Sequence, residues 1–219
     1  IIPDAMMVLS KILSSFHDED GNLLIEGLTV DKSEVTEMDK EILDKMLGGD
    51  ENIPYFKSSS MSEKLWLEPA LDILAIDAPR VEESVNLIIP EATAKVSLRL
   101  APSQDPDEAM DLLRNHVKEN SPWGVDVNFI PGAKGSGVLC SSKGEFIQTL
   151  LKKFNSSWGK EPSFMGVGGS IPFANVFSEQ FPNAEIALIG VSDGELGNAH
   201  APNESVELKD LEKMIEALS

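Results

Sequence analysis

The side chains best suited to chemistry lie in two loops and one strand of the sequence. His200 follows a polar loop, residues 192–198, which comes directly after an apolar run. Loops after the carboxyl ends of parallel strands are where open α/β sheets place their sites. A neutral imidazole among carboxylates there can ligate Zn²⁺ or a related metal. The spacing alone leaves open that His200 is an ordinary structural histidine.

A glycine turn precedes a predicted helix at Gly168-Gly169-Ser170-Ile171-Pro172. Free backbone N–H groups and the helix dipole suit such a turn to an anion, and Ser170 adds a hydroxyl. The turn is not a Walker loop, because no Gly-Lys-Ser/Thr follows it. A tight turn with a capping serine is the alternative interpretation.

Arg99 lies on a strand that has one apolar and one polar face. Between residues 94 and 100, apolar side chains alternate with Lys95, Ser97 and Arg99, which is typical of a half-buried strand. The guanidinium can form a bidentate pair with the carboxylate of a ligand. The alternative is a surface arginine paired with one of the many acidic residues.

The other histidines and the cysteine indicate structure rather than chemistry. His17 ends an amphipathic helix, where a cation suits the helix dipole, and His116 lies on the apolar stripe of another helix. Cys140 has no evident basic helper, so we expect it to be inert. As the single cysteine of the chain, it excludes an intrachain disulfide and fits a reducing compartment, which favours a cytoplasmic location.

The segments around Arg99 predict an α+β arrangement of antiparallel sheet and helices. Apolar residues recur at helical spacing over residues 4–16. Asp105 and Glu108 form the capping pair of another helix, which follows the strand that carries Arg99. The predicted strands cover residues 71–76, 94–100 and 125–130.

The segments around His200 predict a different, α/β class. The glycine-rich stretch 131–137 is the candidate boundary. A helix starting near Ser142, the helix after the glycine turn and a last helix over residues 208–218 follow it. Residues 184–191 form an apolar run that predicts a strand buried on both faces.

Composition limits the classes of partner. The chain has 219 residues, with 37 acidic and 18 basic side chains and a formal charge of −19. Such a surface repels phosphate backbones and anionic lipid, which argues against nucleic-acid and membrane binding. No apolar run approaches the roughly 20 residues that a membrane helix needs.

Three ordered motifs together resemble the M20 metallopeptidases, in particular their dipeptidase and carnosinase-like branch. The motifs are residues 86–106, the glycine turn at 168–172, and Gly190 with residues 198–205. The opening helix and the turn at 17–21 are also similar to the start of that family's lid domain. Their order and separation make the resemblance specific.

The resemblance implies a mixed fold. An α+β lid and dimerisation domain over residues 1–139, lacking its first strand, would precede the C-terminal part of an α/β zinc-peptidase catalytic domain over residues 140–219. It implies a dipeptidase or carboxypeptidase that hydrolyses an amide bond near a free C-terminal carboxylate of a small peptide or N-acyl amino acid. Two zinc ions per full-length subunit, replaceable by cobalt or manganese, and a homodimer through the lid are implied as well.

The resemblance also assigns roles to single residues. His200 matches the last metal-ligating histidine, while Arg99 and the turn residues Gly169, Ser170 and Ile171 match groups that hold the substrate's carboxylate end. The family's His-x-Asp motif is absent, and so is its Glu-Glu pair that supplies the general base.

Because Glu82-Glu83 falls inside the lid-like region, it cannot replace that pair. No catalytic residue is therefore assigned within this chain. We expect a fragment of a longer gene product that is inactive alone and binds zinc weakly or not at all. The alternative is a non-catalytic dimerisation or ligand-binding module derived from such an enzyme.

Overall fold

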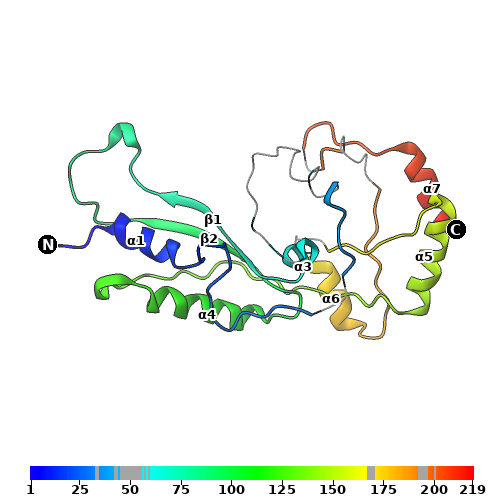
Figure 1. The fold of residues 1–219 in the computed structure, drawn as a ribbon, viewed down its shortest axis with the longest axis horizontal. Coiled ribbons are helices and arrows are strands. Elements are labelled where there is room, and N and C mark those ends of the chain that lie inside the picture. The colour runs from blue at the N-terminus through cyan, green and yellow to red at the C-terminus, as the bar shows by residue number, and fades with distance from the viewer. Residues whose placement is uncertain are drawn as a thin grey trace. The chain divides into compact units, whose positions relative to one another are not determined.

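The computed structural model describes residues 1–32, 35–41, 44, 56, 58, 60–166, 171–191, 197–199 and 201–219. They belong to two compact units (Figure 1). The first unit comprises Ile1–Gly137 with Met165–Pro172, and the second comprises Val138–Phe164 with Phe173–Ser219. None of the described helices is long and apolar enough to cross a membrane. The domain boundary expected after residue 139 stays a prediction.

The first unit combines an antiparallel pair of strands with helices, which confirms the predicted mixed class. Strand β1 (Ala70–Asp77) pairs with β2 (Thr93–Arg99). The helices are α1 (Ala5–Ser14), α3 (Met61–Trp66) and α4 (Pro106–Glu119), and two 3-10 turns are η1 (Val81–Glu83) and η2 (Pro122–Gly124). The predicted opening helix and the first two predicted strands are thus confirmed.

One face of the sheet packs against α1 and α4 (Figure 1). Leu71 pairs with Leu98 in the antiparallel register, and both contribute to this core. The buried members of the cluster are Val8, Ile12, Phe16, Ile25, Leu71, Leu113 and Val117. Each fully buried side chain of this kind stabilises the fold by about 1.5–3 kcal/mol. Because side chains alternate along a strand, the polar residues of β2 lie on the opposite face.

Two aspartates cap the N-termini of helices α1 and α4. The Asp4 carboxylate accepts hydrogen bonds from the backbone N–H of Met7 (3.0 Å) and of Ile89 (3.2 Å), so it caps α1 and ties down the connection between β1 and β2. Asp105 caps α4 as predicted, accepting from the N–H groups of residues 107 and 108. In a capping box the Glu108 carboxylate would accept a hydrogen bond from the Asp105 backbone N–H. Here it accepts one from Gln104 Nε2 instead, at 3.0 Å.

The predicted strand over residues 125–130 is wrong. These residues are irregular, although Val125 and Phe129 pack against the core. Left-handed φ values of 58° at Trp123 and 68° at Gly124 turn the chain just before them. The alternating pattern predicted which side chains would be buried, but a strand also needs a neighbouring strand for its backbone groups.

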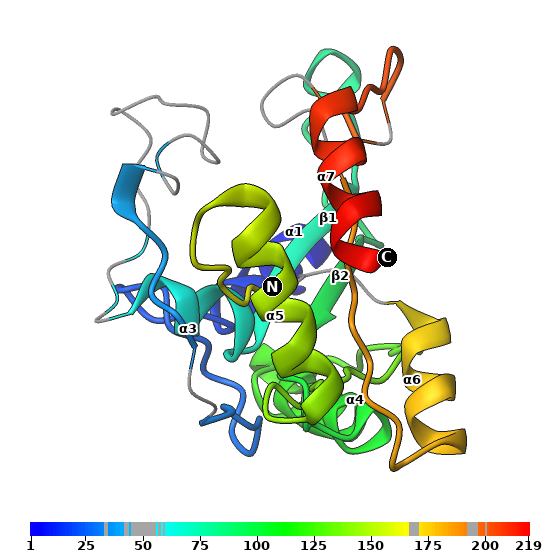
Figure 2. The same cartoon turned by 90° about the vertical axis from the view of Figure 1, so that its right-hand side faces the viewer.

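The second unit contains α5 (Glu145–Trp158), α6 (Pro172–Gln180) and α7 (Leu208–Leu218). All three match predicted helices. Helices α5 and α7 pack together (Figure 2). Trp158 donates from Nε1 to Asp210 Oδ1 at 2.9 Å, and the Lys213 ammonium lies 5.8 Å from the centre of the same ring. These contacts hold α7 against the C-terminal end of α5.

The predicted strand over residues 184–191 is also wrong in this structure. The run is not in a strand, and Leu188 and Ile189 are 52% and 44% exposed. Its start is held, because the Glu185 carboxylate accepts from the backbone N–H of Phe146 (3.2 Å) and Ile147 (2.9 Å). Glu185 thereby caps α5, a role that the sequence had suggested for Ser142. The approach is so close that a Cβ at Gly144 would lie 2.0 Å from the carboxyl group.

Candidate functional site

Arg99 is the last residue of β2, on the face turned away from the helices. Residues along β2 alternate between half-buried and exposed, and Lys95, Ser97 and Arg99 are the exposed ones at the polar positions. No carboxylate of a described residue lies within ion-pair distance of the Arg99 guanidinium. The described residues therefore give no support to the alternative that Arg99 forms a surface ion pair with an acidic side chain of this chain. As far as the described residues show, the guanidinium remains available to bind a planar anion such as a carboxylate.

The glycine turn lies mostly outside the described residues. Gly169 and Ser170 belong to the part of the chain that the structure does not describe, so their proposed contacts stay predictions. Ile171 is described, 40% exposed, and directly precedes α6. A helix does begin at the end of the turn, as the sequence predicted.

The chain that leads into the turn is pressed against α3. A Cβ at Gly166 would lie 2.4–2.6 Å from side-chain atoms of Trp66, so only glycine fits there. Sequence reasoning missed this role, although a glycine just ahead of the glycine-rich motif could have indicated it. Gly166 and Ile171 belong to the same unit as Arg99.

Helix α3, which carries Trp66, has a defined start. The Ser60 hydroxyl accepts from Glu63 N–H at 3.0 Å and donates to Glu37 Oε2 at 2.5 Å. The Ser60 hydroxyl, followed by the backbone N–H groups of Met61 and Ser62, holds the pKa of Glu37 below its usual value. The cap thus anchors the helix against which the approach to the turn packs.

His200 lies outside the described residues, so its role as a metal ligand stays a prediction. Its surroundings on both sides form turns. Ala201 N–H donates to Asn198 O at 2.8 Å, and Ser205 N–H donates to Gly197 O at 3.1 Å. Asn198 and Asn203 have left-handed φ values of 45° and 64°, a conformation that asparagine tolerates better than most residues.

The described residues do not form a metal centre. Among them, no group of three His, Cys, Asp or Glu side chains could hold a metal ion. His116 is occupied elsewhere, since Nε2 contacts Ser15 Oγ at 3.0 Å and Ser15 O at 3.1 Å while the ring stacks on Phe16. A catalytic zinc site needs about three protein ligands. This part of the chain therefore does not fit the metal on its own.

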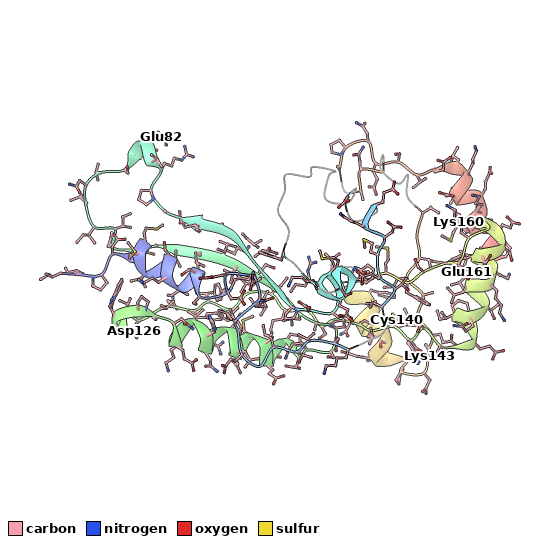
Figure 3. All side chains as sticks on the ribbon, viewed as in Figure 1. Glu82, Asp126, Cys140, Lys143, Lys160 and Glu161 are labelled. Atoms are coloured by element: carbon pink, nitrogen blue, oxygen red, sulfur yellow. The ribbon has the colours of Figure 1, made fainter. Side chains whose placement is uncertain are left out.

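The structure also describes the acidic pair and the cysteine that the sequence analysis weighed. Glu82 and Glu83 lie on η1, in the connection between β1 and β2, and both are exposed. Figure 3 labels Glu82 in this connection. Cys140 is half-buried, and this burial raises the pKa of its thiol. A thiol with a raised pKa carries little thiolate at neutral pH and is a poor nucleophile.

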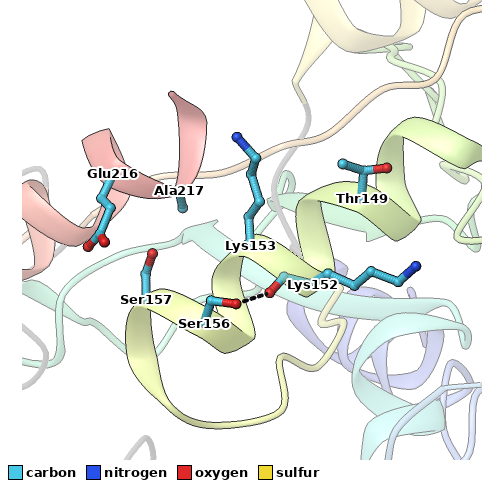
Figure 4. A pocket seen from close by; sticks show the side chains of 7 residues that line it. All are labelled: Thr149, Lys152, Lys153, Ser156, Ser157, Glu216 and Ala217. Carbon is cyan, nitrogen blue, oxygen red and sulfur yellow. Dashed lines mark hydrogen bonds between the residues drawn. The ribbon is translucent and has the colours of Figure 1, made fainter.

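A shallow cavity of about 280 Å³ lies on the second unit between α5 and α7 (Figure 4). Its lining residues are Thr149, Lys152, Lys153, Ser156, Ser157, Glu216 and Ala217. The ammonium groups of Lys152 and Lys153 point away from each other (Figure 4). The Ser156 hydroxyl is used within α5, where it donates to Lys152 O at 3.0 Å. None of the predicted site residues lines this cavity.

Comparison with known proteins identifies the family. Residues 2–125 match the peptidase dimerisation domain of the M20 peptidases. The cysteinylglycine-S-conjugate dipeptidase of Corynebacterium striatum is 30% identical over 221 residues, which cover 96% of this chain and 47% of that protein. The Beta-Ala-His dipeptidase of Rattus norvegicus is 25% identical over 239 residues, covering 94% of this chain and 44% of that protein.

The fold leads to the same family. The crystal structure of an M20 family metallo-carboxypeptidase from Sulfolobus solfataricus has a TM-score of 0.79 at 25% identity, covering 99% of this chain and 51% of that one. The chain thus spans about half the length of the relatives it matches. It belongs to the M20 peptidase family and carries that family's dimerisation domain over residues 2–125.

Proposed function

We propose that this chain is part of a metal-dependent dipeptidase or carboxypeptidase that hydrolyses an amide bond next to a free C-terminal carboxylate. The observation that carries this proposal is the exposed guanidinium of Arg99, which has no described carboxylate partner. Dipeptidases and carboxypeptidases both act on a residue that bears a free carboxylate. Arginine is the side chain that recognises this group best, through two parallel hydrogen bonds.

The other predicted site residues have distinct roles in this proposal. Gly169, Ser170 and Ile171 contact the same carboxylate end of the substrate, where backbone N–H groups and a hydroxyl suit an anion. His200 ligates a metal ion. No residue of this chain acts as general acid or general base, so its own contribution is to orient the substrate and to supply one ligand.

The proposed cofactor is zinc, two ions per full-length subunit, with cobalt or manganese able to occupy the same kinds of ligand. The described residues form no metal cluster, and the chain spans about half of its relatives. We therefore propose that the remaining ligands and the general base come from residues outside this sequence. The chain by itself is then inactive.

The proposed assembly is a cytoplasmic homodimer formed through the lid. The match of residues 2–125 to a peptidase dimerisation domain supports it. The proposed substrate is a small peptide or an N-acyl amino acid, and the formal charge of −19 disfavours nucleic acid and anionic membrane as partners.

A second function is a non-catalytic dimerisation or ligand-binding module derived from such an enzyme. The lack of a metal cluster among the described residues favours it. In that case Arg99 still holds a carboxylate, but no bond is cleaved.

Metal analysis and a hydrolysis assay on the full-length gene product separate the two functions. The peptidase proposal expects bound divalent metal and cleavage of Cys-Gly or β-Ala-His, lost on chelation and restored by zinc, cobalt or manganese. A full-length protein that binds a carboxylate ligand but neither retains metal nor cleaves any dipeptide would be the non-catalytic module.

A further inference from the structure

Arg99 lies at one end of the ladder between β1 and β2, where its own side chain does nothing to hold it in place. It pairs with Ala70, the first residue of β1, and this is the last pair of the register. Its guanidinium has no ion-pair partner among the described residues. The end of a ladder opens more easily than its middle, whereas a bidentate pair with a carboxylate needs accurate placement. Another group must therefore fix this end of the sheet.

Asp31 holds the chain on both sides of this end. Its carboxylate accepts hydrogen bonds from the backbone N–H of Ser103, at 2.9 Å, and from the Ser103 hydroxyl. Its own backbone N–H donates to Leu67 O at 3.0 Å. Ser103 follows Arg99 by four residues. Leu67 precedes Ala70, the strand partner of Arg99, by three residues. Asp31 thus brackets the last pair of the ladder.

A buried glutamine strengthens the same connection. Gln104 is 3% exposed; its Oε1 accepts from the Thr29 N–H at 2.6 Å, and its Nε2 donates to Glu108 Oε2 at 3.0 Å. Its backbone N–H donates to Ala101 O at 3.0 Å and closes the turn that follows β2. Buried polar groups whose hydrogen bonds are made keep a single arrangement. The turn after β2 therefore has little freedom relative to Asp31.

The backbone contact of Asp31 leads toward the glycine turn. Leu67 is 3% exposed and follows Trp66, the last residue of α3. Trp66 lies so close to Gly166 that a Cβ there would meet its side chain. All of these residues belong to the first unit. Asp31 is therefore linked through its carboxylate to the chain after Arg99, and through its N–H to the helix that packs on the approach to the glycine turn.

We infer that Asp31 is a positioning residue, which holds Arg99 in a fixed place relative to the approach to the glycine turn and so raises the affinity for substrates with a free carboxylate. This inference rests on the proposed function, since it requires that Arg99 binds that carboxylate. Asp31 itself does not bind the substrate, because both of its carboxylate oxygens accept hydrogen bonds from Ser103. The alternative is that Asp31 only stabilises the fold.

Steady-state kinetics of Asp31→Ala in the full-length protein test the inference, with Cys-Gly and its C-terminal amide as substrates. A displacement of about 1 Å can cost up to about 100-fold, so we expect KM for the free acid to rise about 10-fold. The kcat should change less than about threefold, because binding and not the chemical step is affected. The KM of the amide should also change less than about threefold, since the amide forms no ion pair with Arg99. The preference for the acid therefore falls.

A double-mutant cycle separates positioning from a loss of stability. If Asp31 acts through Arg99, Asp31→Ala causes no further loss of acid preference in a protein that already carries Arg99→Ala. Asp31→Asn keeps an oxygen that accepts from Ser103, so its KM should stay within about threefold of wild type. Asp18→Ala is the matched control, because Asp18 lies in the same unit and accepts from two backbone N–H groups of its own turn. It should leave the acid preference unchanged.

The thermal midpoint of each variant is measured in parallel. If Asp31→Ala does not fold, Ser103→Ala takes its place. This variant removes one of the two hydrogen bonds to Asp31 and should raise KM for the acid about threefold, an effect that again disappears in the Arg99→Ala background. The inference is overturned if the acid preference survives the variant, if acid and amide lose turnover equally, or if the effect persists without Arg99.

Failure of the proposed function gives a different result. A full-length protein that cleaves neither compound counts against hydrolysis, and the comparison is then made on the dissociation constants of the acid and the amide, measured by calorimetry. Loss of acid preference in Asp31→Ala supports the inference there as well, and an unchanged preference overturns it. A wild-type protein that cleaves the dipeptide without preferring the acid refutes the role of Arg99 and the inference together, but not the hydrolysis.

Discussion

Replacing Arg99 with alanine in the full-length protein removes the guanidinium group that is proposed to bind the substrate's carboxylate. A hydrogen bond between charged partners is worth about 1.5–3 kcal/mol. Because β2 presents Arg99 to solvent, we expect the loss of the bidentate pair to cost about that amount in total, rather than twice as much. At about 1.4 kcal/mol for each factor of ten, kcat/KM for a dipeptide should fall roughly 10- to 150-fold.

The assay compares Cys-Gly with its C-terminal amide, in which the carboxylate is replaced by a neutral group. The wild-type protein should prefer the free acid, and Arg99→Ala should lose most of this preference, because only the free acid contacts the guanidinium. Lys95→Ala is the matched control. Lys95 lies on the same face four residues away, about 13 Å along an extended strand, and its loss should change kcat/KM less than about threefold.

The reasoning would be refuted if Arg99→Ala reduced turnover of the acid and the amide equally, or if Lys95→Ala matched its effect. The first result would show that Arg99 acts on structure or on a later step, and the second that the whole cationic face attracts substrate without contacting it. The variant's unfolding free energy is measured in parallel. It should stay within about 0.5 kcal/mol of wild type, because the side chain is exposed.

Three further predictions follow from the packing and the titratable groups. Gly166→Ala should destabilise the chain by about 1–3 kcal/mol in urea unfolding, since its Cβ meets Trp66, while Gly132→Ala, with open space around it, should be neutral. Cys140 should react with iodoacetamide more slowly than a free cysteine at pH 8, because burial raises the pKa of its thiol; equal rates would contradict this. Hydrogen bonds from the side chain and backbone of Asn22 lower the pKa of Asp18. The ionised carboxylate therefore stabilises the fold above about pH 4, and this stabilisation is lost as the pH falls through the lowered pKa of the folded state. Asp18→Ala should flatten that part of an acid-unfolding profile followed by circular dichroism.

The local signals in the sequence predicted the helices and the register of the sheet faces. Val8 and Ile12 recur at a helical period, and both are buried, since that period places them on one side of α1. Phe16, the next residue of the pattern, is buried just beyond the end of the helix. The strict alternation around Arg99 predicted a half-buried strand, and the exposure along β2 follows it. Periodicity thus placed Arg99 on the open face before any contact was known.

Interactions between distant residues left no comparable signal. The cap of α5 comes from Glu185, which lies 38 residues along the chain from Ile147, so the sequence suggested the nearer Ser142 instead. The contact between Gly166 and Trp66 likewise depends on two segments that meet only in the folded unit. The roles of Gly169, Ser170 and His200 stay predictions, because these three residues lie outside the part of the chain that the structure describes.

The two wrong strand predictions have different physical meanings. At residues 125–130 the pattern marked Val125 and Phe129 as buried, and both do pack against the core. These apolar side chains are therefore covered although the segment forms no β-ladder with a described strand. At residues 184–191 the apolar side chains are not covered in the same way, because Leu188 and Ile189 stay about half exposed. Glu185 holds the start of the run, and residues 185–191 make no main-chain hydrogen bond with any described residue. The second error therefore shows that an apolar run does not by itself specify a strand, whereas the first shows only that alternation reports burial and not pairing.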